Sequence, residues 1–315
     1  MMQTEDLKAR IGDRQVVASV SGGKDSTAMC LHLQELGIPF TPVFLDTGWE
    51  NSTTYQYLRE YLPTVIGEIT WLTPEIKLSD ERLAIAEKFE RRLGHQSAMV
   101  RLILYKGMFP SRVIRFCTQS LKSFVIRDYL NQCTTEPINA LGIRASESQA
   151  RANLPEWEFE DRYDCDIWRP LIRWSEDDVI AIHTRHGVRP NGNYLSGAKR
   201  VGCWPCIYAS KKELHHMAIN DPKRVQLVAD LETEIAKISG EFRGWFQSPI
   251  RADRNTERKS WPIAKVIEWA KTSRGGRQYE LFLPPQREQG CMRWGLCDMA
   301  PTETTKQGNN DDDST

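Results

Sequence analysis

The feature that constrains this chain most is a short glycine-containing loop, Ser21 to Thr27, which reads SGGKDST. The residues before it, 15–20, are mostly apolar and β-branched and predict a strand. The residues after it, 25–36, repeat apolar side chains at helical spacing until Gly37. A loop that opens a helix directly after a strand presents free backbone N–H groups and the positive end of the helix dipole. The sequence therefore predicts a phosphate-binding strand–loop–helix unit.

The composition of the SGGKDST loop suits an anion. Gly22 and Gly23 let the backbone curl closely around a ligand, and Lys24 adds a full positive charge. Hydroxyl donors come from Ser21, Ser26 and Thr27. The spacing matches neither the GxxxxGK[ST] phosphate loop nor the GxGxxG dinucleotide fingerprint. The alternative is an ordinary glycine-rich turn with a solvated lysine.

The order of the elements predicts the fold class. Strand-type segments follow at 40–45, 66–72 and 138–143, and helical patterns at 53–61 (ended by Pro63), after Ser79, at 119–130 and after the capping box at Ser175. This alternation favours an α/β fold with a doubly wound, mostly parallel sheet. We expect a nucleotide-binding domain over 1–196, a smaller cysteine-rich region over 197–300 and a disordered acidic tail over 301–315.

Composition excludes some classes of protein. The 42 acidic and 42 basic residues balance, so net charge gives no reason to expect a polyanion as partner. The sequence has no long apolar run, and its first residues lack the apolar core of a signal peptide. We therefore expect a cytoplasmic protein without a membrane partner. In that compartment the eight cysteines favour metal or redox chemistry over disulfides.

Four of the cysteines form two chelating pairs, Cys203 with Cys206 and Cys291 with Cys297. Two loops that each carry such a pair can close on one Zn²⁺ ion or one [4Fe–4S] cluster, since thiolates suit both. A redox dithiol at the first pair and four unconnected thiols are the alternatives.

Two further positions, Asp46 and Arg144, belong with the SGGKDST loop by their place after strands. Ser21, Asp46 and Arg144 each follow a predicted strand. In an open parallel sheet ligands bind at the carboxyl ends of the strands. The three residues should thus meet at one site.

These segments resemble a known family. SGGKDST matches the signature of the PP-loop, or N-type, ATP pyrophosphatases, also called adenine nucleotide alpha hydrolases. The segments 44–48 (FLDTG), 115–118 (RFCT) with Lys122, 142–148 (GIRASES) with Arg151, and 169–171 (RPL) resemble landmarks of the PAPS reductase branch. They extend over residues 14–206. The cysteines are similar to those of cysteine-rich members that are linked to DNA phosphorothioation.

The resemblance implies roles for particular residues. Ser21, Gly22, Gly23, Lys24, Asp25, Ser26 and Thr27 would hold the pyrophosphate end of ATP, PAPS or APS, and Asp46 would approach the nucleoside. Arg144, Arg151 and Lys122 would stabilise charge on the phosphates or on a second anionic substrate, while Glu147 would hold Mg²⁺ or orient Arg144. The alternative for each of these residues is a solvated side chain or a surface ion pair.

Cys117 in the RFCT segment is a further candidate. Nearby cations should lower the pKa of its thiol and favour the thiolate. The resemblance offers two roles, cluster ligand or persulfide carrier, and a small buried residue is the alternative. Lys24, Asp25, Arg144 and Cys117 are accordingly the predicted catalytic residues.

The activity that the resemblance implies is cleavage of ATP between its α- and β-phosphates. PAPS reductases use a cysteine in a C-terminal Glu-Cys-Gly segment, whereas this tail carries asparagine and aspartate. We therefore expect an ATP pyrophosphatase that adenylates an acceptor in sulfur transfer or nucleic-acid modification. A sulfonucleotide reductase that releases sulfite and a zinc-stapled nucleic-acid-binding module are the alternatives. A cysteine desulfurase or other sulfur donor, DNA or RNA as acceptor, and a second copy of the chain are the partners this reading leaves open.

Overall fold

A six-stranded sheet forms the centre of the molecule. The computed structural model describes residues 4–247, 260–272 and 294. The strands are β1 (Val16–Val20), β2 (Thr41–Leu45), β3 (Thr70–Leu72), β4 (Ile138–Leu141), β5 (Trp157–Glu160) and β6 (Cys165–Trp168), in the order β3-β2-β1-β4-β6-β5. All neighbours pair in parallel except β5, which is antiparallel to β6. This confirms the predicted mostly parallel sheet.

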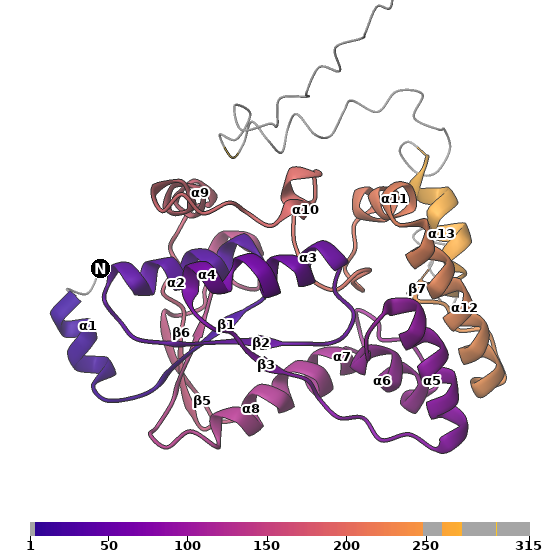
Figure 1. The fold of residues 1–315 in the computed structure, drawn as a ribbon, viewed down its shortest axis with the longest axis horizontal. Coiled ribbons are helices and arrows are strands. Elements are labelled where there is room, and N and C mark those ends of the chain that lie inside the picture. The colour runs from indigo at the N-terminus through magenta and orange to yellow at the C-terminus, as the bar shows by residue number, and fades with distance from the viewer. Residues whose placement is uncertain (1–3, 248–259, 273–293, 295–315) are drawn as a thin grey trace, which may run out of the picture.

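Helices cover both faces of the sheet (Figure 1). Side chains of β1 alternate between them, because successive residues of a strand point to opposite sides. Val16 and Ala18 pack in the core that includes α1 (Thr4–Ile11), α2 (Lys24–Glu35), α3 (Ser52–Gln56), α4 (Pro63–Ile66) and α9 (Glu176–Arg185). Val17 packs in a smaller core against α8 (Phe124–Leu130). The arrangement confirms the doubly wound α/β class.

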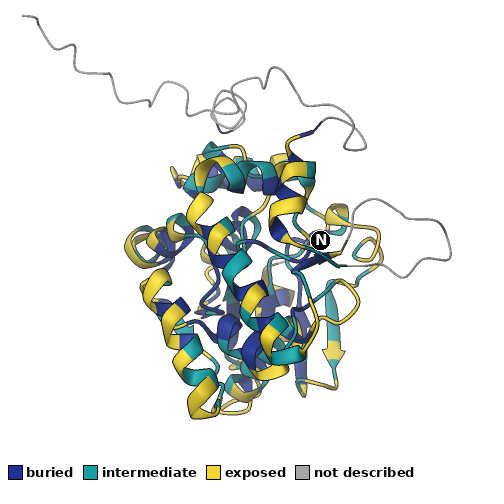
Figure 2. Cartoon of the chain, turned by 90° about the vertical axis from the view of Figure 1, so that its right-hand side faces the viewer, coloured by how far each residue is buried: buried dark blue, intermediate teal, exposed yellow. Residues whose placement is uncertain are grey.

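A second core lies beside the sheet, at the right of Figure 1. It combines α5 (Asp80–Leu93) and α6 (Ala98–Lys106) with α11 (Lys211–Asn220), α12 (Pro222–Ser239), α13 (Ile263–Ala270) and the short strands β7 (Phe246–Gln247) and β8 (Ser260–Trp261). Trp49 is fully buried there and stacks on Trp245 at 5.1 Å between ring centres. Figure 2 turns this side to the viewer and shows exposed residues along the outer faces of the helices. The C-terminal region therefore packs against residues of the first half, and a domain boundary at 196 stays a prediction.

Two predicted elements between β2 and β3 are wrong in their limits. Pro63 does not end a helix, because it is the first residue of α4, where the missing N–H costs no hydrogen bond. A π-helical turn, Tyr57–Tyr61, precedes it, and Gly67 with φ 88° ends the helical stretch. Ile66 thus belongs to a helix, and the strand predicted over 66–72 is reduced to β3.

The helix starts agree better with the sequence. Ser175 and Asp178 form the predicted capping box, with Asp178 N donating to Ser175 Oγ at 3.1 Å. Ser79 does precede α5, but its side chain makes no capping hydrogen bond. Over 119–130 a π-helical turn, Gln119–Ser123, leads into α8. Within the described ranges, no helix has the length and apolar character needed to span a bilayer.

Candidate active site

The ends of β1, β2 and β4 bring the predicted residues to one edge of the sheet. The SGGKDST loop follows β1, Asp46 follows β2 and Gly142 follows β4. A Cβ atom added to Gly142 would lie 2.7 Å from the carbonyl oxygen of Asp25, so only glycine lets the end of β4 approach the start of α2 this closely. This close approach brings Arg144, two residues after Gly142, next to the loop.

The SGGKDST loop is folded on itself. Gly22 has φ 69°, a conformation that favours glycine. The backbone N–H of Ser21 donates to Ser26 Oγ at 3.1 Å, and Ser26 Oγ donates to the carbonyl of Gly23 at 3.1 Å. The Ser26 side chain thereby fixes the curved conformation of the loop. From the sequence we predicted only that this hydroxyl donates to the ligand.

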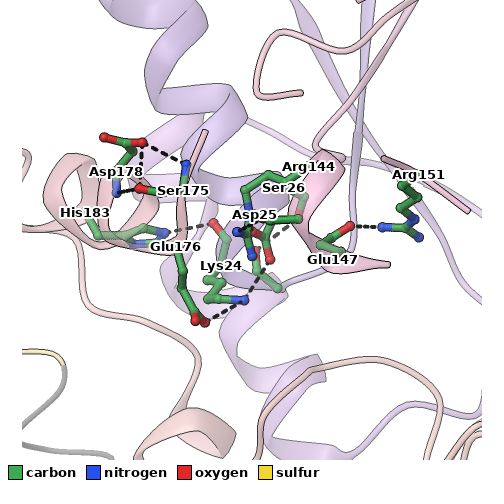
Figure 3. Close-up of polar contacts among 12 residues, drawn as sticks. Lys24, Asp25, Ser26, Arg144, Glu147, Arg151, Ser175, Glu176, Asp178 and His183 are labelled. Carbon is green, nitrogen blue, oxygen red and sulfur yellow. Dashed lines mark hydrogen bonds and ion pairs between the residues drawn. The ribbon is translucent and has the colours of Figure 1, made fainter. Parts of the chain in front are cut away.

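Two buried cations meet at the start of α2 (Figure 3). Lys24 Nζ lies 2.9 Å from Asp25 Oδ2 and 3.5 Å from Glu176 Oε1. Arg144 Nε lies 2.5 Å from Asp25 Oδ1, and its Nη1 donates to Ser146 Oγ at 2.9 Å. One carboxylate thus holds a lysine and an arginine together, and phosphate oxygens are suited to bind the same pair.

Glu147 and Arg151 lie beside this group, with the Glu147 N–H donating to the carbonyl of Arg144 at 3.3 Å. They form an ion pair with each other beside the 3₁₀ turn Ala145–Glu147 (Figure 3). The Arg151 side chain is 42% exposed. An exposed pair of this kind contributes little on its own, and the roles of both residues at the phosphates or at Mg²⁺ stay predictions.

Asp46 is fixed at the end of β2 by two donors. Its Oδ1 accepts hydrogen bonds from Gly48 N at 2.8 Å and from the Tyr55 hydroxyl at 2.7 Å. The same hydroxyl lies 3.0 Å from Glu50 Oε2. Burial, followed by the two carboxylates, raises the pKa of Tyr55. The single proton of Tyr55 therefore serves two acidic side chains, of which the sequence indicated only Asp46.

A second group, here called the thiol cluster, consists of Glu50, Cys117, Lys122, Cys203 and Cys206. Glu50 and Cys203 form an antiparallel bridge, and Cys203 Sγ lies 3.8 Å from Glu50 Oε1. Coulombic interaction with ionised Cys203, and more weakly with Glu50, Cys206 and Cys117, raises the pKa of Lys122 against the opposing effect of burial. The structure thus places Lys122 beside the cysteines.

The thiols of Cys203 and Cys117 are not activated in this arrangement. Burial raises the pKa of Cys203 to about 12, against the opposing effect of Lys122. Burial also raises the pKa of Cys117, although Thr118 and Lys122 act in the other direction. The expectation that nearby cations lower the pKa of Cys117 is therefore wrong, because loss of solvent outweighs one cation. Arg200 Nη2 donates to Cys206 Sγ at 2.9 Å.

The predicted metal site is only half described. Cys203 and Cys206 share one loop, whereas Cys291 and Cys297 lie outside the described residues. Among the residues that the structure covers, no three His, Cys, Asp or Glu side chains are grouped so that they could hold a metal ion. The four-cysteine site stays a prediction.

Four contacts to the loop had no sequence motif of their own. Glu176 reaches Lys24 from the capping box of α9, so only its place at a helix start was visible in the sequence. His183, Asn191 and Tyr194 contact the backbone of the loop. Backbone groups are the same at every residue, so such contacts leave no recognisable pattern.

Comparison with known proteins agrees with this architecture. The family model of the phosphoadenosine phosphosulfate reductase domain matches residues 15–209. An uncharacterized 37.8 kDa protein of Escherichia phage 186 is 34% identical over 90% of this chain and 96% of its own length. The adenosine 5'-phosphosulfate reductase of Streptomyces coelicolor is 37% identical over 62% of this chain and 72% of that enzyme.

Among solved structures, the phosphoadenylyl-sulfate reductase of Candida auris matches with a TM-score of 0.47 and 19% identity, over 64% of this chain and 88% of that one. The assignment rests on the family model, which covers more than half of the chain and includes the SGGKDST loop, Asp46, Arg144 and the first cysteine pair. The chain belongs to the phosphoadenosine phosphosulfate reductase family.

Proposed function

We propose that this protein binds ATP at the SGGKDST loop and cleaves it between the α- and β-phosphates, with transfer of AMP to an acceptor and release of pyrophosphate. One observation carries the proposal. Lys24 and Arg144 are 8% and 5% exposed and converge on Asp25 at the first turn of α2. Fixed cations and N–H groups of this kind stabilise the charge that develops on a departing pyrophosphate.

Each residue of the site has its own role in the proposed reaction. The Lys24 ammonium and the loop N–H groups other than those of Ser21 and Lys24, which already donate to Ser26 Oγ and the Tyr194 hydroxyl, bind the β- and γ-phosphates. Arg144 stabilises the negative charge that develops as the bond between the α- and β-phosphates breaks. Asp25 keeps both cations in place until phosphate oxygens replace it as their partner. Asp46 faces the nucleoside. The Glu147 carboxylate is an oxygen ligand of the type that Mg²⁺ prefers, and Mg²⁺ would offset charge on the pyrophosphate.

We also propose that Cys203 and Cys206, together with Cys291 and Cys297, hold a zinc ion or a [4Fe–4S] cluster. The donor set supports this, because two closely spaced thiols on one loop form half of such a site. Cys117 lies near Cys206 as a further thiol. Iron, zinc and sulfide contents of anaerobically purified protein, with the visible spectrum, distinguish the two groups; absence of both metals would contradict the proposal.

Pyrophosphate release tests the nucleotide proposal. Wild-type protein, ATP, Mg²⁺ and a small-molecule extract as acceptor source should release pyrophosphate. Lys24→Ala should abolish the release, and the exposed control Lys106→Ala should retain it. Equal release by both variants would remove Lys24, and with it the proposed site, from the reaction.

The alternative is a sulfonucleotide reductase. It is favoured by the 37% identity to the Streptomyces enzyme, whose name states that activity, and by the thiols grouped around Lys122. Release of sulfite from APS or PAPS with a thiol reductant, without pyrophosphate formation from ATP, would establish it. A sulfur donor, a DNA or RNA acceptor and a second copy of the chain are the partners proposed for the ATP-cleaving reaction.

A further inference from the structure

Three buried side chains from one segment hold the backbone of the SGGKDST loop. His183 lies in α9, Asn191 caps the short helix α10 (Gly192–Leu195), and Tyr194 lies within α10. Their exposed fractions are 1%, 1% and 6%. No role at the loop follows for them from the family signature, and the reaction proposed above does not use them.

Each of the three contacts a main-chain group at the start of α2. His183 Nε2 lies 2.9 Å from the carbonyl oxygen of Lys24, and the Lys24 N–H donates to the Tyr194 hydroxyl at 3.2 Å. Asn191 Nδ2 donates to the carbonyl of Gly22 at 3.1 Å. The other ring nitrogen, Nδ1, lies 3.3 Å from the carbonyl oxygen of Val188. A carbonyl oxygen only accepts, and we assign the His183 proton to Nε2, which makes the shorter contact. Both backbone groups of Lys24 are thereby occupied.

The Tyr194 contact replaces a missing helix cap. The residue before α2 is Gly23, which has no side chain and makes no capping hydrogen bond. The first N–H groups of a helix have no partner within the helix. The Tyr194 hydroxyl provides one from a different element and so fixes the orientation of the Lys24 amide.

The Asn191 contact joins the loop to the next strand end. Asn191 Nδ2 also lies 3.3 Å from Thr54 Oγ1 in α3, the helix that follows β2. Thr54 in turn leaves no room for a side chain at Gly22, since an added Cβ would lie 3.1 Å from Thr54 Cγ2. Asn191 therefore holds Gly22 at a fixed distance from the neighbouring element.

We infer that His183, Asn191 and Tyr194 are positioning residues, which keep the SGGKDST loop in its phosphate-binding conformation before a nucleotide arrives. The inference rests on the proposed function only for the identity of the ligand. A loop held in this way loses little conformational freedom on binding, so its affinity for phosphate is higher than that of a free loop. Trp294, 7% exposed, packs on two of the three, with ring centres 5.3 Å from His183 and 6.0 Å from Tyr194.

Hydrogen exchange in the nucleotide-free protein tests this directly. Tyr194→Phe and Asn191→Ala should speed exchange of the loop amides about three- to tenfold, the range for loss of one hydrogen bond. The matched control Tyr61→Phe removes a hydroxyl that accepts the Arg189 N–H at 3.0 Å. Asn139→Ala removes a buried asparagine bonded to Ser19. Both controls should leave exchange in the loop unchanged.

Two substitutions of His183 distinguish an effect on loop positioning from an effect on the stability of the whole protein. His183→Ala should speed loop exchange, whereas His183→Gln, which restores an N–H donor, should recover most of the protection at a similar melting temperature. The affinity for α,β-methylene-ATP, which cannot be cleaved at this bond, should fall by the same factor as the exchange rises.

Unchanged loop exchange in Tyr194→Phe, Asn191→Ala and His183→Ala would overturn the inference. Faster exchange in all three, with no binding of α,β-methylene-ATP even by the wild type, would uphold the positioning role and overturn the proposed ATP site instead. The two failures are thus distinguishable in one set of proteins.

Discussion

The SGGKDST loop and the thiol cluster differ in how their charges are satisfied. At the loop, Asp25 lies within 2.9 Å of Lys24 and 2.5 Å of Arg144, so the cations already have a partner that phosphate can replace. In the thiol cluster, Lys122 lies near Cys203 and Cys117, whose thiol pKa values are raised by burial, that of Cys203 to about 12. The loop is prepared for an anion. Cys203 and Cys117 would form thiolates more readily when a metal ion or cluster stabilises that form.

The two regions are joined through Tyr55. Its hydroxyl lies 2.7 Å from Asp46 at the nucleotide side and 3.0 Å from Glu50 in the thiol cluster. Glu50 is held further by Thr47, whose hydroxyl donates to Oε1 at 2.9 Å. Residues at the end of β2 therefore connect both regions, and variants can show how independent the two are.

The largest effect is expected at the loop. Arg144→Ala should lower kcat/KM for pyrophosphate release about 10²- to 10³-fold, the range for loss of one preorganised charge donor. Steady-state kinetics measures it, with the exposed ion-pair residue Arg162→Ala as control. A loss below about threefold would place Arg144 among ordinary ion pairs.

The next effect concerns the core that supports the thiol cluster. Burial raises the pKa of Glu232 to about 7, although it accepts hydrogen bonds from Trp245 N and Ile263 N at 2.9 Å. A raised folded-state pKa means that the folded protein binds the proton more tightly, so stability is lost as pH rises toward and through 7.

Between pH 5 and pH 8 this loss should reach about 2–3 kcal/mol, since one pKa unit corresponds to about 1.4 kcal/mol. Urea unfolding at several pH values measures it. Glu232→Gln, which cannot ionise, should be less stable but should lose that part of the pH dependence. An identical pH slope in wild type and variant would contradict the assignment.

Substitution of Lys122 tests whether this residue acts on the thiol cluster or on the phosphate site. Lys122→Met should raise the pKa of the Cys203 thiol further and slow its alkylation by iodoacetamide about tenfold at constant pH, as for a shift of one unit. Peptide mass spectrometry reads this at Cys203. Affinity for α,β-methylene-ATP should stay unchanged, and a loss as large as that of Lys24→Ala would return Lys122 to the phosphate site.

The smallest effect is expected at Trp294. Trp294→Ala should weaken α,β-methylene-ATP binding about threefold, since it removes packing behind His183 and Tyr194 but no hydrogen bond. The control Trp174→Ala removes a tryptophan that packs on His32, further along the helix α2 that the loop opens, at 4.9 Å between ring centres. Calorimetric titration with α,β-methylene-ATP should show weaker binding by Trp294→Ala than by Trp174→Ala. Equal affinities of the two variants would mean that Trp294 does not influence the loop.

The two regions differ in how well the sequence predicts them, because one is contiguous in the chain and the other joins distant segments. The SGGKDST loop is contiguous, and strand order alone brings Asp46 and Arg144 to it, so this group was predictable. The thiol cluster joins residues 50, 117–122 and 203–206 through packing of the second core, which no local pattern encodes. Glu50 therefore gave no signal, and Lys122 was assigned to the phosphates.

The errors near β3 have a local cause. Proline reads as a helix end in a sequence, yet Pro63 occupies the first turn of a new helix, where proline is tolerated. The apolar residues after it alternated poorly, and an apolar run cannot distinguish a buried helix from a strand. Tertiary packing of Ile66 against the sheet decided between them.

In the proposed reaction, ATP is cleaved between its α- and β-phosphates at the SGGKDST loop. Incubation of the protein with α-³²P-labelled ATP, Mg²⁺ and the small-molecule extract, followed by separation of the products, tests it most directly. The label should appear in AMP or an adenylated acceptor, with an equal amount of pyrophosphate, in the wild type and not in Lys24→Ala. Label in ADP, with free phosphate as the other product, would contradict the account.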